Sequence, residues 1–151
     1  TFDRRTLVGE DEAVILAQVN EAIARAREKN PGLKARCYLA AGEEKCWTGD
    51  TIRAKRYFPE WAVDEHSELV TKARRGLLAA GIDAPLSHFS FCTNGSHFCG
   101  EAQIPTVGFG PSLETLGHVI DEYIEVAQLI KSYHGFISIL EKLTGLEKPC
   151  A

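Results

Sequence analysis

The residue best suited to chemistry in this sequence is a histidine in a glycine-rich stretch. His118 lies in GFGPSLETLGHVIDEYIE, residues 108 to 125, between a predicted strand and a long apolar helix. Open α/β sheets bind ligands beyond the carboxyl ends of their strands. With Asp121 and Glu122 nearby, an imidazole there suits a zinc ligand whose second ring nitrogen is held by a carboxylate or carbonyl. The alternative is a surface histidine that caps the helix, because zinc needs three or four ligands.

A second stretch, CTNGSHFCG at residues 92 to 100, predicts a turn that could face a substrate. Asn94 and Gly95 favour a tight turn, which would leave backbone N–H groups and the Ser96 hydroxyl facing a crevice. A helix that opens there would favour an anionic substrate group. The local sequence alone favours a plain strand-to-helix turn with inert thiols. Three potential metal ligands also occur here, but their spacing matches no zinc ribbon or finger: Cys92, His97 and Cys99.

Composition narrows the function classes. The chain has 151 residues and a net charge of -4, which gives no electrostatic reason to expect nucleic acid or an anionic membrane as a partner. No apolar run approaches the ~20 residues of a membrane-spanning helix. The 5 cysteines are an odd number, which favours reduced thiols and a cytoplasmic protein. The chain has no methionine, so we expect Thr1 to result from processing or from excision out of a longer protein.

The elements that must position these residues begin with an α+β pattern. Residues 1–8 alternate as a strand does, and residues 9–32 predict a helix with acidic residues first, basic residues last and a terminating Asn-Pro-Gly. Residues 33–41 predict a half-buried strand, 42–50 a polar loop and 51–58 another extended segment. This order is similar to half of a ferredoxin-like split β-α-β unit, which would leave a helix face and a sheet edge uncovered.

A second pattern follows Pro59. Residues 65–80 predict a helix, 88–92 and 104–110 predict strands, and 122–143 predict the final helix. Strands that alternate with helices indicate an α/β layer. The sequence therefore predicts two domains, residues 1–58 and 59–151. The final helix carries one apolar stripe: Val126, Leu129, Ile130, Tyr133, Phe136, Ile137 and Leu140.

Three segments together resemble one enzyme family, the dinuclear-zinc aminoacylase, carboxypeptidase G and succinyl-diaminopimelate desuccinylase family. FDRRTLVGED resembles the family's "DRR…GE" strand and the helix after it. FCTNGSHFCGEAQIPTVGFGPS resembles its "TDGS-F---GIPT-GFGPG" block, and LGHVIDEYIEVAQLIKS resembles its "AHTPNEYVEIEDLLKA" block. The resemblance covers nearly the whole chain in order, with Asn94 where many relatives have Asp.

The resemblance implies an α/β catalytic domain with two zinc ions, interrupted by a ferredoxin-like lid that dimerises. On this pattern His118 is the last zinc ligand and Glu122 supports the site. Asn94, Gly95 and Ser96 line the substrate pocket, as does the loop that contains Gly110. The family's other zinc ligands, its general base and its lid histidine belong to segments upstream of Thr1, so no catalytic residue is expected in this chain.

The function that the resemblance implies is zinc-dependent hydrolysis of amide bonds in small peptides or N-acyl amino acids, as in metallopeptidases and deacylases. The chain is then the C-terminal part of such an enzyme: residues 1–58 are the second half of the lid, and residues 59–151 belong to the catalytic domain. We expect it to be inactive alone, to need the N-terminal half of the same protein, and to form a homodimer. The alternative is a non-catalytic binding or dimerisation module that reuses the fold.

Overall fold

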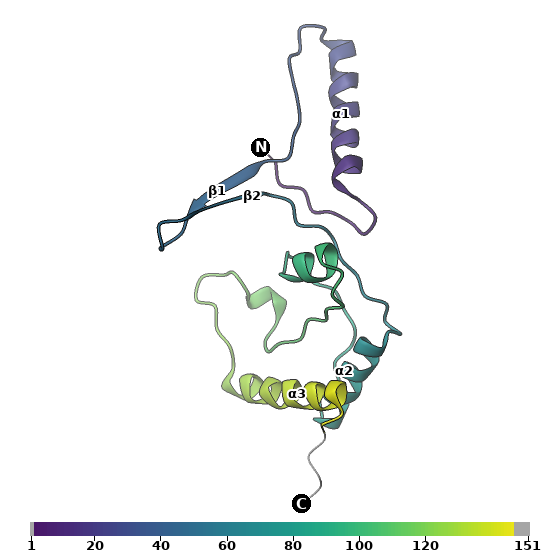
Figure 1. The fold of residues 1–151 in the computed structure, drawn as a ribbon, viewed down its shortest axis with the longest axis vertical. Coiled ribbons are helices and arrows are strands. Elements are labelled where there is room, and N and C mark those ends of the chain that lie inside the picture. The colour runs from purple at the N-terminus through teal and green to yellow at the C-terminus, as the bar shows by residue number, and fades with distance from the viewer. Residues whose placement is uncertain (1, 147–151) are drawn as a thin grey trace, which may run out of the picture. The chain divides into compact units, whose positions relative to one another are not determined.

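A computed structural model describes residues 2–146 of the chain (Figure 1). Contacts divide the chain into two compact units, Thr1–Trp61 and Ala62–Ala151, each with its own structure. The division lies three residues beyond the predicted boundary at residue 58. The chain mixes helices with one two-stranded sheet, which is compatible with an α/β protein. No helix in the described part is long and apolar enough to cross a membrane.

The first unit contains the predicted helix, α1, which spans Glu12–Lys29. The Asp11 carboxylate accepts a 2.8 Å hydrogen bond from the Val14 backbone N–H, which satisfies one of the free donors at the helix start. Asn30 follows the last turn as the C-cap. Ile15 is the one buried residue of α1, so the helix is anchored by a narrow apolar contact.

A hairpin completes the ordered part of the first unit. Strands β1 (Ala41–Lys45) and β2 (Thr51–Lys55) pair in antiparallel fashion, with Glu43 directly opposite Arg53. Those two side chains form a 2.8 Å ion pair across the ladder. The predicted polar loop at 42–50 was therefore wrong for residues 42–45, which form β1, whereas the extended segment at 51–58 is confirmed as β2 over 51–55.

The other two strands predicted for this unit do not form ladders. Residues 2–8 are irregular apart from a turn. Residues 33–40 do not pair with another strand in the described chain. They make one bond next to the hairpin, in which the Ala40 carbonyl accepts from the Arg56 N–H at 2.8 Å. Side-chain exposure between 33 and 39 nevertheless alternates as predicted, with Leu33 and Cys37 half-buried and Tyr38 exposed. The alternation is a property of extended backbone, whereas a strand also needs a partner.

The second unit is built around helices α2 (Glu68–Ala79) and α3 (Val126–Thr144) (Figure 1). Ser67 caps α2, and Gly81 ends it in the left-handed conformation with φ +71°. Gly76 allows the two helices to approach closely, because a Cβ there would lie 2.6 Å from the Ser138 carbonyl oxygen. The core consists of four buried residues: Ala73, Leu77, Ile82 and Ile139.

The strands predicted at 88–92 and 104–110 are absent; both segments run irregularly in the described chain. They still lie against each other, because Gly108 packs directly on the Phe89 ring and has no room for a side chain. The short helix expected after residue 96 is present as a π-helical turn, Ser96–Glu101. A single 3-10 turn, Glu114–Leu116, precedes the His118 loop.

Helix α3 buries a face other than the one that its apolar stripe predicts. Its buried residues are Ser132, Gly135 and Ile139. The stripe itself is exposed, with Tyr133 61% and Ile130 54% accessible. The chain exposes 12044 Å², whereas two separate compact units that share this mass would expose roughly 9,000 Å². The structure therefore leaves unusually much surface uncovered, and the exposed α3 stripe is an apolar part of it.

Candidate functional site

The loop that leads into α3 holds its backbone in an uncommon conformation at three positions. Ser112, His118 and Asp121 have φ values of +75°, +62° and +60°. A side chain other than glycine costs roughly 1–2 kcal/mol in the left-handed region. Such residues concentrate at functional sites, where surrounding contacts hold them in place. The loop is therefore a candidate binding segment.

His118 is fixed on both its backbone and its ring. Its backbone N–H donates a 2.8 Å hydrogen bond to Glu122 Oε2. Its ring meets the Phe91 ring edge to face, with centroids 5.9 Å apart and an interplanar angle of 80°. The residue remains exposed. The imidazole therefore has one aromatic neighbour and stays accessible to a ligand, while Glu122 binds the backbone N–H of the same residue.

A carboxylate ties the segment that carries Phe91 to the same loop. Glu114 Oε1 accepts 2.6 Å hydrogen bonds from both the backbone N–H and the hydroxyl of Ser90. These bonds, first the hydroxyl and then the backbone N–H, lower the pKa of Glu114 below its usual value. At the other end of the loop, Gln128 Oε1 accepts a 2.7 Å bond from the Ser112 N–H.

The turn at Asn94 differs from the expected anion cradle. The Gly95 N–H donates to Thr93 Oγ1 at 3.1 Å, and the N–H groups of the next three residues donate to the carbonyls of Thr93 and Asn94. Ser96 is only 4% exposed, so its hydroxyl does not face a crevice. These donors are already used within the turn. The pocket-lining role of Asn94, Gly95 and Ser96 stays a prediction. If the turn contacts a substrate, it must do so through atoms other than these N–H groups.

The structure brings His118 beside Phe91, three residues before Asn94. In residues 2–146, however, no hydrogen bond joins Asn94 or Ser96 to His118. Gly110 is exposed and has open space around it. Contacts therefore link His118 to Glu122 and to the 88–91 segment. Asn94 follows that segment in the sequence, and Gly110 precedes the loop that carries His118.

No group of three or more His, Cys, Asp or Glu side chains in the described range could hold a metal ion. His118 offers one imidazole, which fits one position of a zinc site and no more. Cys92, His97 and Cys99 do not form such a group either. Zinc binding at His118 therefore requires ligands from outside residues 2–146.

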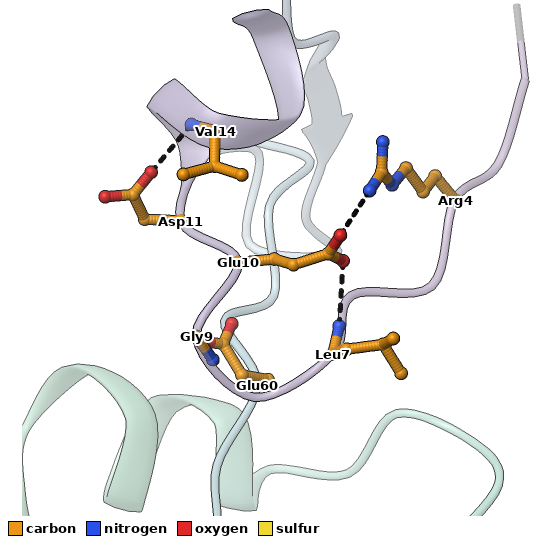
Figure 2. A network of polar contacts seen from close by, with 7 residues as sticks. All are labelled: Arg4, Leu7, Gly9, Glu10, Asp11, Val14 and Glu60. Atoms are coloured by element: carbon orange, nitrogen blue, oxygen red, sulfur yellow. Dashed lines mark hydrogen bonds and ion pairs between the residues drawn. The ribbon is translucent and has the colours of Figure 1, made fainter. Parts of the chain in front are cut away.

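The segment that resembles "DRR…GE" serves the fold of the first unit (Figure 2). The Arg4 guanidinium pairs with Glu10 Oε1 at 2.5 Å, while Glu10 Oε2 accepts a 3.0 Å bond from the Leu7 N–H. The Leu7 bond is the main reason that the pKa of Glu10 is lowered, and Arg4 adds to it. Glu60 Oε1 accepts from the Gly9 N–H at 3.1 Å. Arg4 and Glu10 thus fold this loop.

Sequence reasoning missed two residues that shape the site, Phe91 and Glu114. Phe91 belongs to a predicted strand, where an aromatic residue is expected for packing alone. Glu114 lies in a Gly-Pro-rich loop, with nothing in its sequence context to indicate Ser90 as a partner. Both contacts join positions more than 20 residues apart, so only the fold could identify them.

Comparison with known proteins gives one similar sequence in two strains. No family model matches the chain, and no solved structure matches it significantly. The chain is 29% identical over 125 residues to YgeY of Escherichia coli strain K12 and, equally, to YgeY of Escherichia coli O157:H7, both described as uncharacterized. The alignment covers 81% of this chain but 29% of each relative, so the chain spans less than a third of their length.

Proposed function

We propose that this chain contributes the His118 loop to a zinc-dependent hydrolase of amide bonds, with small peptides or N-acyl amino acids as substrates. The observation that carries the proposal is the way His118 is held. Its backbone is in the left-handed region, its N–H is bound by Glu122, its ring is oriented by Phe91, and its imidazole is accessible. A surface histidine that only caps a helix would need none of these restraints.

The exposed stripe on α3 supports the view that a longer protein completes this fold. Exposed apolar patches of this kind mark surfaces that another segment or subunit covers. The length of YgeY agrees with this view, because the region similar to this chain makes up only 29% of that protein. We propose that the completed fold is a peptidase-like α/β domain, with residues 1–58 as half of a ferredoxin-like lid.

In that assembly His118 would bind one of two zinc ions, with the remaining ligands supplied by the rest of the protein. Zinc, when bound, acidifies a water molecule and polarises the scissile carbonyl. The part played by this chain is positional. Glu122 holds the His118 backbone, and Phe91 prevents the ring from turning away from its ligand. We propose a cytoplasmic homodimer as the working form.

The test uses the native product purified from its source cells. We expect an intact mass far above that of this chain, two zinc ions per polypeptide by elemental analysis, and hydrolysis of N-acetyl amino acids. His118→Ala in the full product should lower zinc content toward one and kcat/KM at least about 100-fold. Glu122→Gln should lower kcat/KM roughly 10-fold and leave the ligand in place.

The matched control is His66→Ala, which removes an exposed imidazole from the same unit and should change neither zinc content nor rate. A full product that binds zinc equally well with and without His118 would overturn the metal assignment. A product with the mass of this chain alone would overturn the hydrolase, because the described residues supply no complete metal site.

A binding or dimerisation module is the second candidate, and the exposed α3 stripe favours it as well. The two proposals differ in what covers the stripe. A module should dimerise tightly as the 151-residue chain, whereas the hydrolase part should stay monomeric or aggregate until the rest of the protein is added. Sedimentation velocity on the chain, with and without Tyr133→Ser in the stripe, distinguishes them.

A further inference from the structure

The first unit pairs its basic side chains unevenly. Six of them form ion pairs with carboxylates: Arg4, Arg5, Arg25, Arg53, Lys55 and Arg56. Five have no carboxylate partner within the described residues of the unit: Arg27, Lys29, Lys34, Arg36 and Lys45. Four of these five lie close together in sequence where α1 ends, in a protein whose net charge is -4. The unpaired positive charge of the unit is therefore concentrated in one place.

Three of these four residues, Arg27, Lys34 and Arg36, line an open groove of about 540 Å³. Its lining combines three cations with a small apolar floor: Arg27, Pro31, Leu33, Lys34, Ala35 and Arg36. Residues 34 and 36 lie two apart on extended backbone and therefore project to the same side. Arg27 reaches the groove from the last turn of α1. Positive groups from two different stretches of chain thus converge on one hollow.

Two of the guanidinium groups are held in position before any ligand arrives. Arg27 Nη2 donates a 2.5 Å hydrogen bond to the Ala35 carbonyl oxygen, which leaves its other N–H groups available. The Arg36 guanidinium carbon lies 5.3 Å from the centre of the Tyr38 ring, within cation–π range. Fixing a guanidinium in advance reduces the side-chain entropy lost on binding. The groove is therefore arranged as well as charged.

The dipole of α1 accounts for only part of this cluster. Arg27 and Lys29 complement the negative end of the helix, as basic residues in a last turn commonly do. The influence of the dipole fades within one turn, so it gives no reason for Lys34 and Arg36. Glu28 is the carboxylate nearest in sequence, and it does not line the groove. Even if the negative charge of Glu28 is counted, the three cations that line the groove leave a net positive charge there.

We propose that this groove is a binding site for a small organic phosphate. Guanidinium groups donate pairs of parallel hydrogen bonds to phosphate oxygens, and Lys34 adds a point charge. The apolar floor of Pro31 and Leu33 would contact the carbon part of the ligand. The site lies in the first unit, whereas His118 lies in the second, so it stands or falls independently of the proposed zinc chemistry.

The experiment titrates the 151-residue chain with phenyl phosphate, inorganic phosphate and succinate, followed by backbone amide NMR shifts. We expect saturable shifts at residues 27 and 33–38, with phenyl phosphate tighter than inorganic phosphate because of the apolar floor. Succinate tests whether a carboxylate serves equally well. Lys34→Ala should weaken phenyl phosphate binding at least about tenfold, because it removes a charged hydrogen-bond donor from the ligand.

Lys45→Ala is the matched control, because it removes the same charge from the unpaired lysine of β1 outside the groove. It should leave the dissociation constant within twofold. Equal weakening by Lys34→Ala and Lys45→Ala would show attraction to overall charge only, and so would overturn the site. So would the absence of saturable shifts up to about 10 mM ligand. Succinate bound more tightly than phenyl phosphate would overturn the phosphate assignment.

Discussion

The two units of this chain are held together by different forces. The first unit buries one large apolar side chain, Ile15, and otherwise relies on exposed ion pairs such as Arg53–Glu43 and Lys55–Glu12. The second packs α2 on α3 around a four-residue core, with glycine at the closest approach. Exposed ion pairs contribute at most about 1 kcal/mol each, whereas a buried leucine or isoleucine contributes roughly 1.5–3 kcal/mol. The second unit should therefore be the more stable and the more cooperative in unfolding.

Gly76→Ala should have the largest effect, because it acts on the contact that defines the second unit. The new Cβ would lie 2.6 Å from the Ser138 carbonyl oxygen and 2.7 Å from Ile139 Cα. Backbone atoms cannot move aside as a side chain can, so we expect a loss of roughly 3 kcal/mol by urea unfolding. Gly110→Ala is the control: its Cβ would meet nothing within 4 Å, and stability should be unchanged. Equal effects of the two substitutions would contradict the close helix approach.

Leu77→Ala compared with Ile15→Ala measures the difference between the units directly. Leu77 and Ile15 are both 7% exposed, but only Leu77 belongs to a cluster of buried residues. We expect Leu77→Ala to cost about 3 kcal/mol and Ile15→Ala about 2 kcal/mol, both in the lower half of the usual range for such truncations. Unit-specific hydrogen exchange should record each loss within its own unit. A larger loss for Ile15→Ala would reverse the ranking of the units.

His118 provides a smaller effect that separates backbone from side chain. His118→Gly should stabilise the second unit by roughly 1 kcal/mol, because glycine adopts φ +62° without strain. His118→Ala keeps the strain and should not stabilise. Thermal unfolding of the two variants gives the difference. Identical melting temperatures would show that the loop relaxes and that the backbone is not held.

The smallest effect concerns pH, and it compares one carboxylate from each unit. The pKa values of Glu10 and Glu114 are both lowered below 4.5 by hydrogen bonds and charge. A depressed pKa means that the ionised form supports the fold, so the stabilising effect is complete above the ordinary pKa and is lost as pH falls through the lowered value. We expect the Leu7 and Ser90 amide shifts to change together with these protonations in an NMR titration. Glu28→Gln should leave the pH dependence of both amide shifts unaltered, whereas Glu10→Gln should abolish the pH-dependent change of the Leu7 amide shift.

The sequence predicted the helices of this fold well and its strands poorly, for a physical reason. A helix satisfies its hydrogen bonds locally, so the charge pattern and the terminating Asn-Pro-Gly placed α1, and the apolar periodicity placed α2, to within a few residues. A strand needs a partner that can be distant in sequence, and residues 33–40 have the right alternation without one. The sequence located the apolar stripe on α3, but it could not show that the stripe is exposed, because periodicity locates a face and does not provide what covers it.

The candidate site divides in the same way. His118 and Glu122 could be predicted from residue type and loop composition, and the 2.8 Å bond between them is local in sequence. The edge contact with Phe91 and the Glu114–Ser90 tie depend on tertiary folding, so no local pattern could indicate them. The sequence also could not show that the backbone N–H groups of the Asn94 turn bind acceptors within the turn; only the structure shows these hydrogen bonds.

The positive φ at His118 also determines what evolution can reveal about this position. Two requirements would meet there, a backbone that favours glycine or asparagine and the imidazole that the proposed zinc site needs. A descendant that lost the chemistry but kept the loop would drift to glycine or asparagine, since those residues adopt the conformation most readily. A descendant under selection for the imidazole would retain histidine despite the strain. The residue found at this one site would therefore show, in any future set of homologues, which lineages still use the loop and which only inherit its shape.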